Sequence, residues 1–441
     1  MSLNIALGGL AGRFRLRDVA WGLLLFGIYT TERFKWSIGG VSLRYSLVAL
    51  AVLSALAFFR APRAWVAKTA RDPWLSAWWP FLGVSAVSVI LSANRTTAVL
   101  VWGWNALTLI LCADWASRRS WREIRLPWLV ALLGHAGVIL WDEFCIAEIL
   151  PRAWALGNLF PTYGTFRPAG FYVAPQFTLV ALACSGFIWL LLDHSERPRF
   201  RMLPFWMALG FVVSRTGLVM KGAILALGHL FGNFSREGKQ RWQAILFPWL
   251  LGNLATLGFL VLLSPAQGKE LRQLFGLQQT WARVCPWVDQ QFPRWLDCPV
   301  SEVPLPHGNP VWSSEGKRLA EWDQVGDDLR ERPLLGHGYL GAAEKLIAPE
   351  HREGAVQKRV QYRFESLWAT ISSYYGALGL MTLVGALAFW LRRLQRGAGA
   401  VVFAVFWLIG AHSSQVFARL DLWLPFFLLA NLGAAESPVR D

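Results

Sequence analysis

Twelve apolar stretches recur along the chain, and they constrain its fold more than any other feature. An apolar stretch of roughly 17 to 25 residues is long enough to cross a bilayer as a helix. Because only 16% of the residues are charged and the mean hydropathy is +0.37, the composition is typical of a membrane protein. We predict an all-α, polytopic membrane protein with about twelve transmembrane helices. The predicted helices cover residues 19–32, 41–59, 74–92, 97–115, 127–149, 172–193, 203–214, 216–233, 244–264, 366–391, 399–412 and 421–434, of which 203–214 and 399–412 are short for a span.

Lys and Arg residues cluster in alternate connections between these stretches. They precede the first stretch and follow the second, fourth, sixth, eighth and tenth, in the segments RAPRAWVAKTARD, RRSWREIR, ERPRFR, SREGKQR and RRLQR. Short cytoplasmic loops of membrane proteins carry an excess of basic residues. The pattern therefore predicts that both termini are cytoplasmic, and it explains most of the net charge of +15 without nucleic-acid binding. No cleavable signal peptide is expected, because the first stretch has no small-residue cleavage site.

One long polar segment divides the chain into three parts. Residues 1–264 hold nine predicted helices, residues 265–364 form the polar segment, and residues 365–441 hold the last three helices. The predicted topology places the polar segment outside the cytoplasm, where an oxidising compartment allows Cys285 and Cys298 to form a disulfide. The other three cysteines lie in or beside apolar stretches and are expected to be packing residues.

The polar segment contains a predicted amphipathic helix. In GKRLAEWDQVGDDLRERPLLGHGYL, the apolar residues Leu319, Trp322, Val325 and Leu329 recur at helical spacing. Pro333 and the glycines of GHGYLG then end the helix in a turn. We expect this helix to lie over the transmembrane bundle. The 26 Trp residues of the chain fit interfacial belts, with sugar stacking as the alternative role for some of them.

Signatures of soluble enzymes are missing from the sequence. It has no phosphate-binding glycine loop followed by Lys, no zinc-ligand spacing and no G-x-S-x-G motif. Four charged residues are instead predicted at the outer membrane face: Arg167, Arg215, Arg318 at the start of the amphipathic helix, and Glu365 at the start of the tenth span. Converging arginines favour a bound phosphate or diphosphate. Alternatively, each Arg extends to lipid phosphates, and Glu365 pairs with a neighbouring Arg or complements the helix dipole.

Four motifs of the chain occur together in one order and spacing. They are FRPAGFYVAPQ, SRTG before an apolar helix, RLAEW leading to RPLLGHGYL, and ESLWATISSYYGALGL. In this order, over roughly residues 160–380, the chain resembles the superfamily of O-antigen ligases and O-antigen polymerases, which are bacterial membrane glycosyltransferases. Twelve spans with a large loop between the ninth and tenth are also similar to that superfamily. The resemblance implies a GT-C-like fold in the bacterial inner membrane, with a periplasmic active site.

The resemblance further implies metal-independent transfer of a glycan, with no cofactor. The donor would be undecaprenyl-diphosphate-linked oligosaccharide, and the acceptor a hydroxyl of a glycan or of lipid A core. Further expected partners are membrane lipids and a chain-length regulator. The positions that match family arginines, Arg215 and Arg318, would bind the diphosphate as leaving group, and Arg167 is a third candidate for that role.

The residue expected to accept the proton departs from the family pattern. Many members have His at the position of Glu365, followed by Asn, Ser or Gln and then, after nine intervening residues, by G-x-x-G. Here Ser366, Gly376 and Gly379 fit this pattern, but the His is Glu. A carboxylate can accept a proton that leaves late in the transition state. The alternatives are that His337 is the base or that no single base is essential.

Three functions stay open at this point. A polymerase of O-antigen or exopolysaccharide repeats is slightly favoured over an O-antigen ligase, because the family His is missing. A flippase for an anionic lipid-linked substrate would also use external arginines, but it needs polar groups along its path, and Lys221 is the clearest charge inside the predicted spans. An inactive assembly partner is the third alternative.

Overall fold

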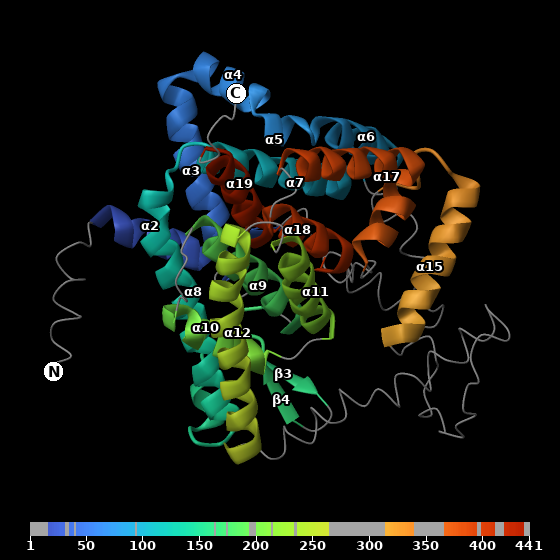
Figure 1. Cartoon of the computed structure of the whole chain (residues 1–441). Helices are drawn as coiled ribbons and strands as arrows, with labels where there is room; N and C mark the ends of the chain where they lie inside the picture. The colour runs from blue at the N-terminus through green and yellow to red at the C-terminus, as the bar shows by residue number, and fades with distance from the viewer. Residues whose placement is uncertain are drawn as a thin grey trace, which may run out of the picture.

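The computed structural model of the chain is predominantly helical (Figure 1). It describes residues 16–30, 35–38, 41–92, 95–162, 165–172, 175–193, 200–212, 215–232, 236–263, 314–338, 366–394, 398–410 and 419–435. The predicted all-α class holds for most of this part of the chain. Two short antiparallel hairpins are added to it: β1 (Lys35–Ile38) with β2 (Val41–Arg44), and β3 (Leu159–Thr162) with β4 (Thr165–Pro168).

Every one of the twelve apolar stretches forms helix over most of its length. The helices are α2 (Leu16–Ile28), α3 (Tyr45–Arg60), α5 (Pro73–Ser76) with α6 (Trp79–Leu91), α7 (Arg95–Ala116), α8 (Trp121–Ile146), α9 (Pro175–Leu192), α10 (Leu203–Phe211), α11 (Arg215–Gly232), α12 (Arg236–Leu263), α17 (Leu367–Arg393), α18 (Ala398–Val405) with the π-helical turn η5 (Phe406–Gly410), and α19 (Leu420–Ala435). Two short 3-10 helices, η1 (Arg152–Trp154) and η2 (Phe200–Met202), lie before β3 and before α10.

Three helices of the described chain are long and apolar enough to cross a membrane: α7, α8 and α17. A fourth span results if α3 and α4 (Pro62–Arg71), which meet at a bend of 120°, count as one broken span. Six further apolar helices are shorter: they lie in α2, α6, α9, α12, α18 with η5, and α19. This set of helices indicates a membrane-embedded protein.

The helices form two groups that cross in space. In Figure 1, α8, α10 and α12 run side by side down the view, whereas α6, α7 and α17 run across it. Helix α2 packs on α8 in the first group, and α19 contacts both α7 and α9. Helix α9 also contacts α8, α10 and α11. As a result α9 and α19 join the two groups in the centre of the molecule.

Tryptophan residues fill much of the core, which differs from the expected interfacial belts. Trp78, Trp390, Trp407 and Trp423 are almost completely buried, and the rings of Trp78 and Trp423 lie 4.7 Å apart. The indole Nε1–H of Trp390 donates a 2.9 Å hydrogen bond to the carbonyl of Trp74. Others, such as Trp79 and Trp154, are exposed. Large aromatic rings stabilise contacts between helices beyond the area that they bury, so several tryptophans serve packing.

The predicted amphipathic helix is present as α15 (Ser314–Glu331), which stands at one side of the molecule against α17 (Figure 1). Its Val325 is buried, and Leu329 packs against the core, as the spacing predicts. Trp322, expected on the same face, is 42% exposed. The helix begins four residues before Arg318, which therefore lies in its second turn and not at its start. A turn over residues 332–338 follows, as Pro333 and the glycines predict.

Candidate functional site

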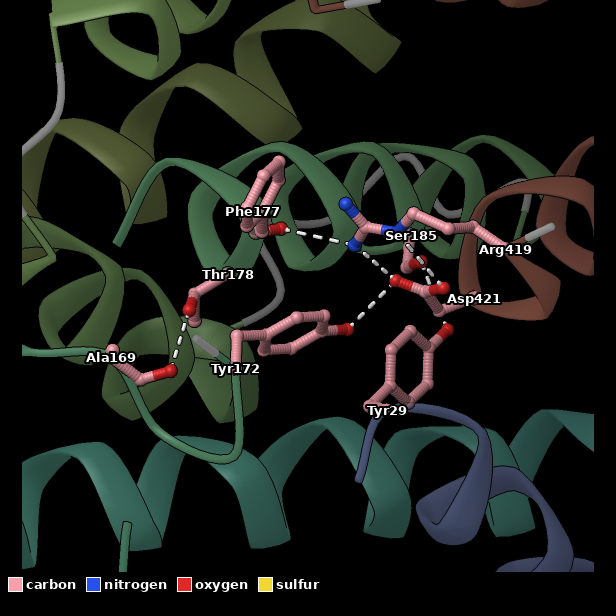
Figure 2. A network of polar contacts seen from close by, with 8 residues as sticks. All are labelled: Tyr29, Ala169, Tyr172, Phe177, Thr178, Ser185, Arg419 and Asp421. Atoms are coloured by element: carbon pink, nitrogen blue, oxygen red, sulfur yellow. Dashed lines mark hydrogen bonds and ion pairs between the residues drawn. The ribbon is translucent and has the colours of Figure 1, made fainter. Parts of the chain in front are cut away.

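A buried ion pair at the start of the last helix is the centre of the candidate site. The Arg419 Nη2 atom donates to Asp421 Oδ2 at 2.5 Å, and Nε donates to Oδ1 at 3.3 Å (Figure 2). Nη2 also donates to the Phe177 carbonyl at 3.4 Å. The guanidinium lies 5.3 Å from the Tyr172 ring and 5.2 Å from the Phe177 ring. Because Asp421 is fully buried and Arg419 nearly so, the two charges stabilise each other in a low-dielectric site.

Two tyrosines extend this network towards other helices. The Tyr172 hydroxyl donates to Asp421 Oδ2 at 3.0 Å, and the Tyr29 hydroxyl, at the end of α2, donates to Ser185 Oγ on α9 at 2.9 Å. The Trp128 indole on α8 donates to the Tyr29 oxygen at 3.0 Å. The Tyr172 hydroxyl thus gives the buried Asp421 carboxylate a hydrogen-bond donor in addition to Arg419.

The hairpin that carries Arg167 is held beside this network by local polar contacts. Arg167 lies on β4, opposite Phe160 of β3. Two residues later, the Ala169 carbonyl accepts a 2.6 Å hydrogen bond from the Thr178 hydroxyl at the start of α9. Figure 2 shows this contact next to Tyr172 and Arg419. The fold thus holds Ala169, two residues after Arg167, against the start of α9, and the side chain of Arg167 lies outside the described part.

A buried carboxylate at the end of α8 fixes the chain that leads into the hairpin. The Asp142 Oδ1 atom accepts from the backbone N–H of Leu156 at 2.8 Å and of Gly157 at 3.0 Å. A Cβ atom at Gly157 would lie 2.2 Å from Asp142 Oδ2, so only glycine allows this approach. The Asp142 side chain is fully buried. This carboxylate therefore has a structural role in positioning the hairpin.

A second polar cluster joins α15 to α17 and contains His337. The Ser373 hydroxyl donates to the Asp328 Oδ2 atom at 2.6 Å, and the Gln324 amide donates to Oδ1 at 2.7 Å. The His337 Nε2 atom lies 3.8 Å from Asp328 Oδ1 and 3.5 Å from Glu331 Oε2. Asp328 is fully buried, whereas the His337 side chain is 11% exposed. His337 therefore sits beside two carboxylates, with its Nε2 atom buried.

A break in α17 explains why the turn of His337 fits at this place. Gly376 has φ 61° and ψ −160°, which interrupts the helix and leaves backbone groups without helical partners. The turn after α15 satisfies them. The backbone N–H of His337 donates to the Ser373 carbonyl at 3.0 Å, and that of Gly338 to the Tyr374 carbonyl at 2.9 Å. In return, Leu378 N–H donates to the Leu334 carbonyl at 3.1 Å.

The remaining candidates of the sequence are placed only in part. Arg215 is the first residue of α11 and Arg318 lies in α15, and both side chains are outside the described part. Glu365 precedes Ser366, which caps α17 by accepting from the Ala369 N–H, and Glu365 itself lies outside the described residues. Convergence of the three arginines thus stays a prediction. The Cys285–Cys298 disulfide also falls outside the described residues, while the cysteines at 112, 145 and 184 are buried thiols.

The sequence argument missed Arg419, Asp421 and Asp328. The signal for the first two was a charged pair directly before an apolar stretch, in ARLDLWLP, where an ionised residue is costly unless it has a partner. Asp328 looked like one of several exposed acids on an amphipathic helix. Within the described residues, no cluster of three or more His, Cys, Asp or Glu side chains could hold a metal ion.

Comparison with known proteins identifies no family for the chain. No protein-family model matches the chain, and no curated protein matches it either.

Proposed function

We propose that the protein is a membrane glycosyltransferase that moves a glycan from an undecaprenyl-diphosphate carrier to an acceptor hydroxyl. The transfer takes place at the periplasmic face of a bacterial inner membrane that the chain crosses twelve times, with both termini in the cytoplasm. The motif order of residues 160–380 is the sequence basis of this proposal. The structural basis is the way in which charged and polar groups at the helix ends pair with one another.

Several contacts between helix ends fit a chain that crosses a membrane in alternation, and they support the topology in the proposal. In a twelve-span chain, α2 ends on the outside, and α9 and α19 begin there. In the network of Figure 2, Arg419 joins the start of α19 to Phe177 at the start of α9, whereas Tyr29, after α2, bonds to Ser185 in the middle of α9. The end of α6 and the start of α17 would also lie outside. There the Ser88 hydroxyl donates to the Leu335 carbonyl in the turn that packs against the start of α17.

Contacts at the expected cytoplasmic ends follow the same alternation. The Arg125 Nε atom at the start of α8 lies 2.6 Å from Asp193 Oδ1 directly after α9. Ser54 near the end of α3 donates to Asp114 near the end of α7 at 2.5 Å. The Arg119 guanidinium lies 4.2 Å over the Trp21 ring near the start of α2. Basic groups therefore gather at helix ends that the positive-inside pattern assigns to the cytoplasm.

The chemistry that these residues support is displacement of a diphosphate by a hydroxyl. Arginine side chains bind phosphate oxygens in a bidentate manner and keep their charge at all relevant pH values. Arg167, Arg215 and Arg318 would stabilise the departing diphosphate, while Glu365 or His337 would accept the proton of the attacking hydroxyl. The described position of His337, with Nε2 3.8 Å from Asp328 Oδ1, supports its candidacy, because a nearby carboxylate stabilises a protonated imidazole.

The proposal is tested with purified protein and an undecaprenyl-diphosphate oligosaccharide in buffer containing EDTA. Release of undecaprenyl diphosphate together with formation of a glycosylated acceptor is expected. Arg215→Ala and Arg318→Ala should each lower the rate by about 100-fold, the effect of losing one charge-stabilising donor. Arg152→Ala is the control, because Arg152 is exposed and pairs with Glu148. Wild-type turnover in both arginine variants would exclude the diphosphate-binding role.

The product distinguishes the two transferase functions. A longer lipid-linked glycan identifies a polymerase, which the replacement of the family His by Glu365 slightly favours. A glycan attached to lipid A core identifies a ligase. Movement of intact lipid-linked oligosaccharide across proteoliposomes, without release of the diphosphate carrier, would instead identify a flippase.

A further inference from the structure

Helix α4 turns away from α3 and carries an exposed group of basic residues. The two helices meet at Ala61 with a bend of 120°, so α4 does not continue the direction of α3 (Figure 1). The segment RAPRAWVAKTAR, residues 60–71, contains four basic residues and no acidic residue. All four are exposed: Arg60, Arg63, Lys68 and Arg71. The bend therefore brings a strongly cationic surface to the end of an apolar helix.

The basic residues of α4 lie on one side of the helix. At 3.6 residues per turn, Arg63, Lys68 and Arg71 fall within an arc of about 140° around its axis. On the opposite side Thr69 is buried and Trp65 is partly buried, whereas Val66 next to them is exposed. A helix with one basic and one mainly apolar side is typical of helices that lie in the interface of a membrane.

Exposed apolar side chains connect α4 to the outer face of α3. Three exposed residues of α3 recur at the spacing of one helix face: Val52, Leu56 and Phe59. Phe59, in the last turn before the bend, is 77% exposed. The Phe58 ring packs edge-on against the rings of Phe59 and Trp65, with centroids 5.6 Å apart in each pair. Because Trp is enriched where hydrocarbon meets water, this aromatic group places the bend at the level of the lipid headgroups.

Contacts with the bundle hold α4 in this position. The Lys68 Nζ atom donates to the carbonyl of Ser117, directly after α7, at 3.4 Å. Asp72, directly after α4, accepts from two backbone N–H groups at the start of α5 at 2.9 Å each. The Asp72 carboxylate also interacts electrostatically with Lys68 and Arg393. Even at the one carboxylate next to α4, positive charges are thus in excess.

We propose that α4 lies in the plane of the membrane surface, where Arg63, Lys68 and Arg71 bind the headgroups of anionic phospholipids. In this position Val66 and Phe59 enter the hydrocarbon, and the long basic side chains extend to the phosphates. An acidic soluble protein would match the charge, but the basic surface is continuous with the exposed apolar face of α3, which only a lipid layer covers along its length. Lipid binding at α4 does not depend on the proposed transferase activity.

The position of α4 is tested with spin labels in full-length protein in lipid nanodiscs. Ala64 and Val66 are exposed and lie on opposite sides of α4. In a background in which Cys285 and Cys298 are replaced by Ser, each is changed to Cys and labelled. We expect the label of Val66→Cys to be relaxed mainly by oxygen, which concentrates in lipid, and the label of Ala64→Cys mainly by a water-soluble nickel chelate. Equal access of both labels to the chelate would overturn the membrane position and favour a soluble acidic partner.

Lipid binding is tested in detergent by titrating phosphatidylglycerol, phosphatidylcholine and inorganic phosphate. We expect the wild type to bind phosphatidylglycerol most tightly, and Arg63→Gln/Lys68→Gln/Arg71→Gln to bind it at least about 10-fold more weakly, because each basic residue near the headgroups contributes attraction. Arg63→Lys/Arg71→Lys keeps the charge and should bind within twofold of the wild type. Arg330→Gln, at an exposed ion pair with Asp327, is the control and should also bind like the wild type.

Three results would overturn the lipid surface. One is wild-type binding of phosphatidylglycerol by the triple Gln variant. Another is binding of phosphatidylcholine or inorganic phosphate as tight as that of phosphatidylglycerol, because either would remove the preference for an anionic lipid. The third is loss of binding in Arg63→Lys/Arg71→Lys, which would show that the arginines act through local structure and not through charge.

Discussion

The Ser373 hydroxyl on α17 donates a 2.6 Å hydrogen bond to the Asp328 carboxylate on α15, and both residues are fully buried. This bond joins a helix of the polar segment to the first part of a predicted transmembrane helix. It therefore fixes the position of α15, which carries Arg318, relative to the start of α17, which follows Glu365. The relative position of Arg318 and Glu365 therefore depends on the bond between Ser373 and Asp328.

Replacing Ser373 should measure the strength of this contact. Ser373→Ala leaves Asp328 buried with one donor fewer, and hydrogen bonds to charged groups contribute roughly 1.5 to 3 kcal/mol. We expect a loss of this size in the free energy of unfolding, and faster proteolysis within α15, in detergent solution. Thr382→Ala is the matched control on the same helix, because Thr382 bonds only to carbonyls of its own helix at Leu378 and Gly379. Equal effects of the two substitutions would contradict the role of the Asp328 bond.

The break in α17 should tolerate no side chain at Gly376. A Cβ atom there would lie 2.6 Å from the Leu334 carbonyl carbon and 2.7 Å from the Gly336 nitrogen, both of which are backbone atoms. The φ of 61° at this residue is in addition unfavourable for alanine. We expect Gly376→Ala to displace the turn of His337 and to destabilise the protein by more than about 2 kcal/mol. Thermal unfolding and hydrogen exchange of residues 333–338 check both effects.

Gly385 provides the control for that substitution. It lies on the same helix, and a Cβ atom at Gly385 would meet nothing within 4 Å. Gly385→Ala should leave stability unchanged or raise it by up to about 1 kcal/mol, because alanine favours helix. A Gly376→Ala protein as stable as Gly385→Ala would show that the break is not required.

Removing one charge of the Arg419–Asp421 pair should destabilise the protein more than removing both charges. Arg419→Met leaves a fully buried carboxylate that keeps the Tyr172 donor but loses its cation, and loss of one partner of a buried pair costs roughly 3 to 5 kcal/mol. In Arg419→Met/Asp421→Leu both charges are gone, so part of the stability should return. Unfolding temperatures of the two variants in the same detergent test this order. A double variant less stable than Arg419→Met would refute it.

Labelling of single cysteines should establish the two faces of the membrane. The proposed topology places the exposed residues Ala153 and Ala64 outside and inside, respectively. In a background in which Cys285 and Cys298 are replaced by Ser, Ala153→Cys should react with a membrane-impermeant maleimide in intact cells. Ala64→Cys, on α4, should react only after permeabilisation. The reverse pattern, or labelling of both in intact cells, would contradict the twelve-span arrangement.

Conservative substitutions should identify the proton acceptor. Glu365→Gln and His337→Gln keep the approximate shape of each side chain but remove its basic function. We expect the variant of the true base to lower the transfer rate about 100- to 10,000-fold, the usual contribution of general base catalysis, while lipid-diphosphate binding stays within twofold of the wild type. Loss of binding would indicate a structural effect, and two fully active variants would show that no single base is essential.

The helices could be predicted from the sequence because their signal is local. The residues of each apolar stretch predict a helix without information from the rest of the chain. The spacing of Val325 and Leu329 likewise predicted the buried face of α15. Helix α4 was missed because it is short, basic and mostly exposed, and lies directly after a longer apolar stretch. The burial of Trp78 and Trp423 was also missed, since composition places tryptophan in a membrane protein without saying which neighbours it has.

The candidate site was predictable only where charge and motif coincide in sequence. Arg167, Arg215, Arg318, Glu365 and His337 were named from their positions relative to apolar stretches. The Tyr172–Asp421 bond joins residues 249 positions apart, and no local pattern reports such a pairing. Asp328 differs from its exposed neighbour Asp327 only by one helical step, which turns its carboxylate towards Ser373.

The contact between the turn of His337 and the break of α17 has a consequence for recognising distant relatives. A Cβ atom at Gly336, Gly338 or Gly376 would lie 2.6 Å or less from a neighbouring backbone atom, which is the Ser373 oxygen, the Ser88 oxygen or the Leu334 carbonyl carbon, respectively. A chain that keeps this contact would need glycine at these three places, whichever side chain accepts the proton. The spacing of the three glycines is therefore a sequence pattern by which chains with the same contact can be sought.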